Sequence, residues 1–163
     1  MAISFKNVGF KSNDRRFSKE ITLNPIGIKT PLALSNSDRN TLFEMHLEPE
    51  LQVHDNLRNL ILTNNGERLG RFNYGANLRS LNFDYSASEE FEQEAALRIQ
   101  EAVRISMPFV ELEDMEVRGV ERDLGNNYNL PPGLAQVLIT ITYNVPKIRV
   151  VGKKLQVVIY VGG

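Results

Sequence analysis

The feature that most constrains the fold is a pair of alternating runs toward the end of the chain. Within residues 134–143 and again within residues 155–161, apolar side chains occupy every second position. Because successive side chains of a β-strand point to opposite faces, this period predicts two strands, each with one buried face. The predicted buried positions are Val137, Ile139, Ile141, Tyr143, Leu155, Val157, Ile159 and Val161.

A third strand and polar connectors complete the predicted sheet. Residues 109–117 predict the strand, and the connectors 121–133 and 144–154 have the polar composition of hairpin loops. The sheet is therefore predicted to be mostly antiparallel. The last strand, which we expect at or near a sheet edge, carries Val158 and Tyr160 on its second face, and a freely solvated strand does not need this apolar surface. We expect a partner to cover both residues.

Helical periodicity occupies the middle of the chain. An apolar stripe at helical spacing begins at Val53, and Asn64, Asn65 and Gly66 give the helix a C-terminal stop. A second, very short helix is predicted at residues 76–81. The side chains expected to form the core of the helix layer are Leu57, Leu60, Leu78, Leu81 and Phe83.

The longest predicted helix begins after Ser86. Ser86 and Glu89 have the Ser-x-x-Glu spacing of a capping box, and Pro108 ends the helix because the residue before a proline is pushed out of the helical region. Helices packed on one face of a mostly antiparallel sheet give an α+β fold. The apolar stripe of this helix comprises Phe91, Ala95, Ile99, Ala102, Val103 and Ser106.

The first part of the chain has a different character. Residues 1–36 show no sustained period, and we interpret them as an N-terminal arm with a short strand at Phe17–Leu23. Such an arm buries little apolar surface, so it docks on its own domain, docks on a partner or stays mobile. Residues 37–163 are predicted to form a single domain, with a further brief strand at residues 41–47.

Composition excludes several kinds of site. The chain has no cysteine, which excludes disulfides, thiolate metal sites and a cysteine nucleophile. His46 and His54 have no further pair of ligands around them, so we expect no metal, and no motif suggests a cofactor. No window approaches the roughly 20 apolar residues of a membrane span. A net charge of −1 argues against general nucleic-acid binding.

The charge is unevenly distributed along the chain. Residues 84–116 carry 10 acidic and 2 basic side chains, whereas the segments on either side carry an excess of basic residues. This block is either a solvated helix face with polar strand positions, or a patch that faces a basic partner surface.

The most specific motif follows the first predicted helix. Gly66 suits a left-handed turn, and Gly75 lets backbone pass close beside its neighbour. Adjacent Glu67 and Arg68 point in different directions, so each is expected to anchor the turn to a separate element, unless both are simply solvated. The motif comprises Gly66, Glu67, Arg68, Tyr74, Gly75, Leu78, Leu81 and Phe83.

These residues resemble the gene-25-like family of baseplate wedge proteins from contractile phage tails, which includes a type VI secretion baseplate component. The resemblance covers about residues 27–143 and starts with the weaker Gly27-x-Lys29-Thr30-Pro31-Leu32. It implies a structural subunit of the virion tail baseplate, present in six copies and assembled in the host cytoplasm. It also implies other wedge proteins and the tail sheath protein as partners, with the tail tube as a further candidate, and a role in starting sheath assembly.

One position departs from the family. The family carries Glu-Pro-Arg where its long helix ends, a motif linked to contact with other wedge subunits, whereas this chain has Met107-Pro108-Phe109. Only the proline is retained. Either Met107 and Phe109 replace the charged clamp with an apolar contact, or both fill the core of their own domain.

Three further functions are open from the sequence. Some family members carry a lysozyme-like label, but a glycosidase needs two carboxyl groups about 5 to 9.5 Å apart across a cleft. Here the acidic residues crowd one helix start or, at Glu111, Glu113 and Asp114, occupy strand positions expected to face water, so we expect no enzyme. The sequence also admits a component of a related injection system, and it admits a regulatory binding module because a bacterial anti-adaptor protein shares this fold.

Overall fold

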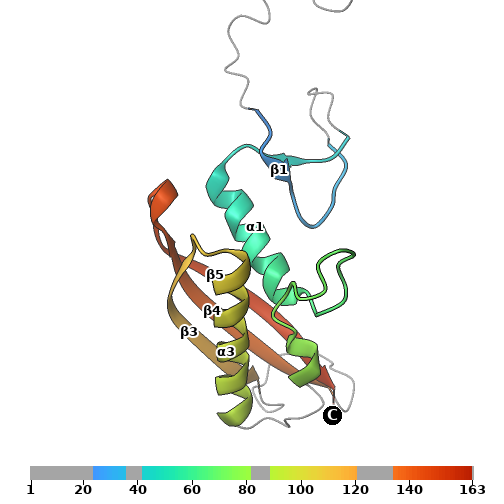
Figure 1. Cartoon of the computed structure of the whole chain (residues 1–163), viewed down its shortest axis with the longest axis vertical. Coiled ribbons are helices and arrows are strands. Elements are labelled where there is room, and N and C mark those ends of the chain that lie inside the picture. The colour runs from blue at the N-terminus through green and yellow to red at the C-terminus, as the bar shows by residue number, and fades with distance from the viewer. Residues whose placement is uncertain (1–23, 36–41, 82–88, 121–133, 163) are drawn as a thin grey trace, which may run out of the picture.

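The fold places helices beside a three-stranded antiparallel sheet, with a small two-stranded hairpin at one end (Figure 1). The computed structural model describes residues 24–35, 42–81, 89–120 and 134–162. Within these ranges the predicted α+β class is confirmed. In chain order the elements are β1 (Gly27–Ile28), β2 (Met45–His46), α1 (Pro49–Leu62), the 3-10 turn η1 (Leu78–Ser80), α3 (Glu89–Ser106), β3 (Glu111–Val120), β4 (Leu134–Val145), the 3-10 turn η2 (Pro146–Ile148) and β5 (Val150–Gly162).

The larger sheet has the order β3-β4-β5, so β5 is an edge strand as predicted. Ile139 of β4 pairs with Val117 on one side and with Val157 on the other. Apolar rows therefore cross all three strands on one face, and this face is buried. Of the predicted buried positions, Val137, Ile139, Ile141, Tyr143, Leu155 and Val157 are confirmed, and Ile159 is half-buried.

The hairpin connector predicted at 144–154 is confirmed in position but is shorter than predicted, because β4 extends to Val145 and β5 already begins at Val150. The chain reverses over η2 and Arg149, which adopts a left-handed conformation with φ 57°. Lys153 and Lys154 belong to the strand, and their polarity reflects exposed strand positions rather than a loop. The side-chain oxygen of Asn144 accepts the backbone N–H of Gly152 at 2.7 Å, beside the irregular register at this end of the pair.

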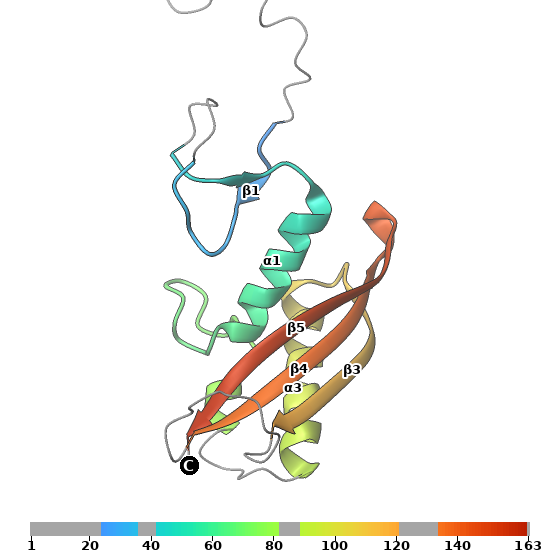
Figure 2. The ribbon, with the colours of Figure 1, turned by 180° about the vertical axis from the view of Figure 1, so that it is seen from behind.

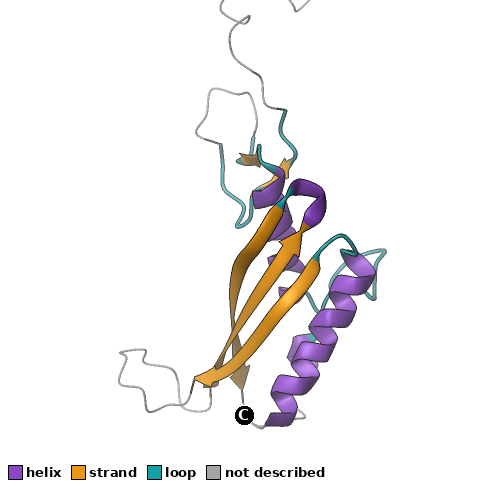
Figure 3. Cartoon of the chain, turned by 90° about the vertical axis from the view of Figure 1, so that its left-hand side faces the viewer, coloured by secondary structure: helices purple, strands orange, loops and turns teal. Residues whose placement is uncertain are grey.

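The helices cover one face of the sheet. Seen from behind, the strands lie in front of α3, and the described elements leave this second face uncovered (Figure 2). Figure 3 shows α3 along the covered face, while α1 contacts both α3 and β5. Helix α3 ends at Ser106, just before Pro108, as predicted. Both predicted helical stripes are confirmed by burial. The buried helix-layer residues include Leu57, Leu60, Leu78, Leu81, Phe91, Ala95, Ile99, Ala102 and Val103. The predicted core residue Phe83 and the predicted capping residue Ser86 lie outside the described residues.

The short helix predicted at 76–81 is confirmed in part, as the 3-10 helix η1 that begins at Leu78. Asn77 adopts a left-handed conformation with φ 51°, so a helix cannot continue through it. The preceding segment is held by α1, because the N–H of Ala76 donates to the carbonyl of Leu60 and the N–H of Asn77 donates to that of Thr63. These hydrogen bonds hold Leu78 in the core.

The hairpin connects part of the predicted arm to the predicted domain. β1 pairs with β2, and an isolated bridge joins Leu34 to Phe43. The predicted strand at 41–47 is thus confirmed in part, as the two residues of β2 and this bridge. The pairing crosses the boundary predicted between residues 36 and 37, while the strand predicted at Phe17–Leu23 lies outside the described residues.

Replacing Leu60 by Ala is expected to lower the free energy of unfolding by about 2 to 5 kcal/mol, because the side chain is 0% exposed and its loss leaves a cavity. The matched control is Leu97→Ala on α3, where the leucine is 60% exposed. Urea unfolding would measure both. A loss below about 0.5 kcal/mol for Leu60→Ala would show that this residue is not a core residue.

Candidate assembly interface

A buried polar cluster joins the hairpin to helix α1. One carboxylate oxygen of Asp55 accepts the backbone N–H of Thr30 at 2.8 Å and its hydroxyl at 3.0 Å, and lies 2.7 Å from Nε2 of His46. Both His46 and Asp55 are buried. Burial alone raises the pKa of Asp55, but the hydrogen bonds from His46 and Thr30 outweigh it and hold the pKa below its ordinary value. We call Thr30, His46 and Asp55 the clasp.

A second histidine ties α1 to the sheet. Nδ1 of His54 lies 3.0 Å from the hydroxyl oxygen of Tyr143 on β4. Burial lowers the pKa of His54 and raises the pKa of Tyr143 to about 12, so both side chains are neutral near pH 7. Nearby, Lys153 at the start of β5 pairs with Glu50 in the first turn of α1. These contacts fix α1 beside the β4–β5 hairpin.

The predicted motif forms a turn that is braced from within. The carboxylate of Glu67 accepts the backbone N–H of Asn64 at 2.8 Å and its side-chain amide at 2.9 Å, and these hydrogen bonds lower the pKa of Glu67. The guanidinium of Arg68 lies 3.8 Å from the ring centre of Tyr74, a cation–π contact. The expectation that Glu67 and Arg68 anchor separate elements is therefore wrong, because both contact residues of the same turn. The link to η1 comes from Asn64, whose side-chain oxygen accepts the N–H of Arg79 at 3.1 Å.

The predicted left-handed conformation of Gly66 and the predicted close backbone approach at Gly75 are confirmed, although the approach is to Thr63 instead of Tyr74. Gly66 has φ +86°, and its N–H donates to the carbonyl of Phe72 at 2.9 Å, although α1 itself ends earlier, at Leu62. Gly75 has φ +116°, and a Cβ there would lie 2.1 Å from the carbonyl oxygen of Thr63. Only glycine permits this close approach of the turn to the end of α1.

The Met107-Pro108-Phe109 stretch divides between core and surface. Met107 is 5% exposed and belongs to the core, so it offers no free apolar contact. The N–H of Met107 donates to the carbonyl of Val103 at 2.7 Å, so the helical hydrogen bonding of α3 continues to this residue. Pro108 is exposed, and Phe109 is half-buried against the core. A partner contact at Pro108 and Phe109 stays a prediction.

The uncovered face of the sheet carries two apolar side chains of the last strand. Val158 is 38% exposed and Tyr160 is 56% exposed, as their position on the second face predicts. The register places Leu138 beside Val158 and Arg118 on the far side of Leu138. Burial of this surface by a partner stays a prediction. Elsewhere on the sheet, Glu111, Glu113 and Asp114 of β3 are exposed, as predicted.

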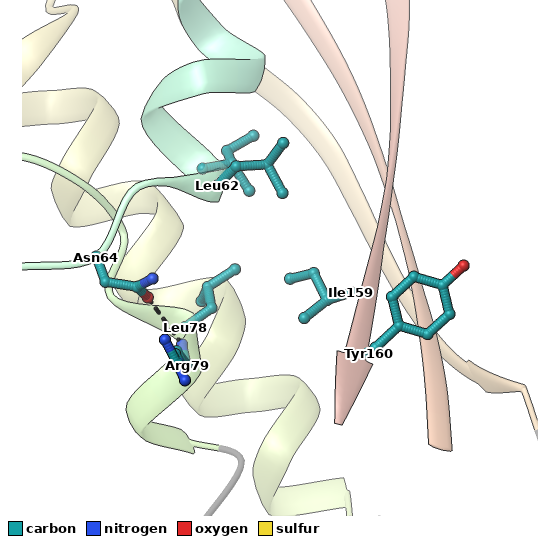
Figure 4. A pocket seen from close by; sticks show the side chains of 7 residues that line it. Leu62, Asn64, Leu78, Arg79, Ile159 and Tyr160 are labelled. Carbon is teal, nitrogen blue, oxygen red and sulfur yellow. Dashed lines mark hydrogen bonds between the residues drawn. The ribbon is translucent and has the colours of Figure 1, made fainter. Parts of the chain in front are cut away.

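A hollow of about 200 Å³ lies between the end of α1, η1 and the end of β5 (Figure 4). Ile159 points into it from β5, and Tyr160 points to the opposite side of the strand. Leu62, the last residue of α1, is 44% exposed at the hollow. The lining residues are Ile61, Leu62, Asn64, Leu78, Arg79, Ile159 and Tyr160.

The clasp and the hollow are the features that sequence reasoning missed. Both join residues far apart in the chain, and alternation or helical spacing carries no information on such contacts. The available signal for the clasp was Asp55, an acidic residue two positions from the core residue Leu57 and next to His54. The signal for the hollow was weaker. Arg79 lies in the predicted short helix and Ile159 in the last predicted strand, and nothing in either pattern indicates that the two residues lie close together.

Comparison with known proteins finds similarity in structure alone, since no family model and no curated protein matches the sequence. A chain from the six-fold symmetrised baseplate of the anti-feeding prophage matches with a TM-score of 0.56 at 20% identity, over 75% of this chain and 85% of that chain. The two chains share a fold. This finding is consistent with the resemblance to gene-25-like baseplate proteins.

A second solved structure is less similar. A putative tail lysozyme from Geobacter sulfurreducens matches with a TM-score of 0.47 at 19% identity, over 71% of this chain and 91% of that chain. A likeness at this level carries no argument about function. Separately, none of the helices in the described part of the chain is long and apolar enough to cross a membrane.

Replacing Asp55 by Asn is expected to lower the free energy of unfolding at pH 7 by about 1 to 3 kcal/mol, because the amide loses hydrogen bonds to a charged group. Since the folded-state pKa of Asp55 is depressed, its stabilisation is present above the unfolded pKa and is lost as pH falls through the folded pKa. The gap between wild type and variant should therefore close below about pH 4.

Chemical unfolding at pH 7 and at acid pH measures this effect. The matched control is Asp114→Asn, at an exposed carboxylate of β3, which should change stability by less than about 0.5 kcal/mol. A gap of equal size at both pH values would show that the charge of Asp55 does not stabilise the clasp.

Proposed function

We propose that this chain is a structural component of the baseplate of a contractile tail or tail-like injection machine. The observation that carries the proposal is the fold shared with the anti-feeding prophage baseplate chain, of which the match covers 85%. The motif from Gly66 to Leu81 supports it from the sequence side. Fold alone does not fix function, so the further support comes from the surfaces that the chain leaves open.

Within a baseplate, we assign the chain the role of a wedge subunit. It lies among other wedge proteins near the tail tube, in six copies, and meets the first ring of the tail sheath, where it helps to start sheath assembly. The exposed Pro108 and half-buried Phe109 are the candidate contacts with other wedge proteins. In a phage this role is exercised in the virion tail, and in a related injection system in the corresponding baseplate.

The edge of β5 is the candidate joint to the sheath. Within the described residues β5 pairs along its length with β4 and with no strand on its other side. An edge strand presents unpaired N–H and C=O groups, so an extended segment of a partner can add to the sheet by main-chain hydrogen bonds. Lys153 and Lys154 lie on this strand, and charged residues at an edge discourage aggregation of the free protein.

We propose that the chain has no catalytic role. Asp55 is the buried carboxylate of the described residues, and its depressed pKa keeps it ionised, whereas a glycosidase acid needs a raised pKa. The Oδ2 oxygen of Asp55 takes part in the hydrogen bonds of the clasp, with Thr30 and His46. The acidic residues of β3, from Glu111 to Glu116, lie exposed on an edge strand instead of facing one another across a cleft.

Purified protein is therefore expected to leave peptidoglycan intact. Turbidity of a cell-wall suspension would be followed over time, with an active lysozyme as positive control. Clearing by the pure protein that disappears when one carboxylate is replaced by its amide, for example in Glu94→Gln, would give the chain a hydrolytic function.

Proline at Val158 is expected to prevent sheath assembly on baseplates that otherwise form. The substitution removes one main-chain donor of β5 and disturbs strand addition at this edge. Glu116→Pro places the same residue on β3, the opposite edge of the sheet, and serves as the matched control. Electron micrographs of particles would show baseplates and tubes without sheath for Val158→Pro, and sheathed tails for the control.

Thermal melts of both purified variants must first show that each is folded. Normally sheathed tails from a folded Val158→Pro variant would place the joint to the sheath elsewhere, most directly on the N-terminal arm.

A further inference from the structure

The two edges of the sheet have opposite charge. β3 exposes four carboxylates, and Arg118 is the only basic residue of the strand. The four carboxylates are those of Glu111, Glu113, Asp114 and Glu116. The central strand β4 has no charged residue, and β5 has Lys153 and Lys154 with no acidic residue. Lys153 pairs with Glu50 of α1, so the positive charge that this edge offers to a partner comes from Lys154, which is in none of the ion pairs between described residues. One row of the register crosses the sheet from Asp114 through Thr142 to Lys154. An acidic strand is therefore favoured beside β5 and repelled beside β3.

The hollow lies at the far end of the basic edge. β5 is the edge strand, and Ile159 near its end points into the hollow toward α1 and η1 (Figure 4). Leu62 lines it from α1, and Leu78 lines it from η1. These side chains are apolar, and the volume of about 200 Å³ exceeds that of one large aliphatic side chain. A segment paired with β5 passes directly beside this space.

Arg79 adds a positive charge to the same place. Its backbone N–H is held by Asn64, and its side chain is exposed at the hollow. Within the described ranges its guanidinium takes part in none of the ion pairs, which join other residues. Its charge acts on the nearby Glu67 carboxylate, whose hydrogen bonds are made to Asn64. The guanidinium can therefore also pair with a carboxylate from outside the chain, and such pairing is strongest when it is planar and bidentate.

We infer that the hollow and Arg79 together read the sequence of the strand that joins β5: an aliphatic side chain of the partner enters the hollow, and an acidic side chain two positions away pairs with Arg79. The inference rests on the proposed function, in which a partner strand adds to β5. Side chains two positions apart on a strand lie on the same face, so both can turn toward the helices. Main-chain hydrogen bonds supply affinity at such a joint, while pockets for alternate side chains supply specificity.

The chemistry of the partner follows from the hollow and its charge. The occupant is an extended segment of another protein with an acidic and an aliphatic residue in alternate positions. A second copy of this chain offers no such segment in its own β5, which has no acidic residue. In β3, Leu112 and Asp114 are two positions apart, but the register is irregular between them and Leu112 packs against its own core. Leu112 is therefore not available to fill the hollow of another copy.

NMR titration of the isotope-labelled protein tests the inference. The probe is the end-capped peptide Ser-Thr-Asp-Thr-Leu-Thr-Val-Thr-Ser, compared with one peptide that has Lys for Asp and another that has Ala for Leu. Shifts are expected for the amides of β5 and for those around Leu62, Arg79 and Ile159. Each altered peptide should bind about tenfold more weakly, as expected for the loss of one anchoring contact.

Two variants locate the contact, each with a matched control. Leu62→Trp fills the hollow and should abolish the preference for Leu over Ala, whereas Leu97→Trp, on the exposed side of α3, should retain it. Arg79→Glu should reverse the preference between the Asp and Lys peptides, whereas Arg104→Glu, exposed near the end of α3, should not. The inference would be overturned if replacing either the Asp or the Leu of the peptide left its affinity unchanged. It would also be overturned if the chemical-shift changes occurred along β3 instead of β5.

Two further outcomes also decide the matter. Light scattering would show whether the free protein forms dimers. If it does, and Leu62→Trp makes it monomeric, the hollow binds a second copy of the chain and the inference is overturned. The peptide titration does not depend on particle assembly. If Val158→Pro gives particles without sheath but all the peptides bind equally well, the role of the hollow alone is refuted. If Val158→Pro gives sheathed particles but the peptides bind with the expected preferences, the sheath joint alone is refuted.

Discussion

The inward face of β4 is the contact on which the remaining structure depends. Its side chains lie between those of two neighbouring strands and beneath the helix layer, and Ile139, Ile141 and Tyr143 are almost fully buried. Burial of apolar surface is the dominant favourable term in folding. The hydroxyl of Tyr143 extends this contact to α1 through His54, so one residue joins the central strand and the first helix. The position of α1 in turn determines where the hairpin, the motif turn and the hollow lie.

The elements with strong local periodicity were predictable, and the contacts between distant residues were not. α3 and the inward face of β4 follow from spacing alone, because a helix and a strand impose periods that the apolar residues must match. The start of β5 at Val150 was missed, since exposed strand positions such as Lys153 and Lys154 have the composition of a loop. η1 depends on the hydrogen bonds from Ala76 and Asn77 to the end of α1, and no local pattern reports them.

The candidate interface shows the same division. Val158 and Tyr160 were placed correctly on the second face of the sheet, which the described elements leave uncovered, because period two assigns faces once the strand is known. Met107 was open to two interpretations from the sequence, and its burial decides for the core. The clasp could not be predicted, since it brings Thr30 to Asp55 across 25 positions of the chain through the β1–β2 pairing. Polar networks of this kind are specified by the fold rather than by their neighbours in sequence.

The long pairing of β5 with β4 has a mechanical consequence. The two strands pair from Leu134 opposite Gly162 to Val145 opposite Val150, with one register shift between Tyr143 and Val145, so the ladder extends along nearly all of β5. A force that pulls β5 along its own axis loads these hydrogen bonds side by side in shear, and they must yield together. A force that lifts its end away from the sheet would instead open them one after another. A joint formed along this strand therefore resists an axial pull far better than it resists peeling.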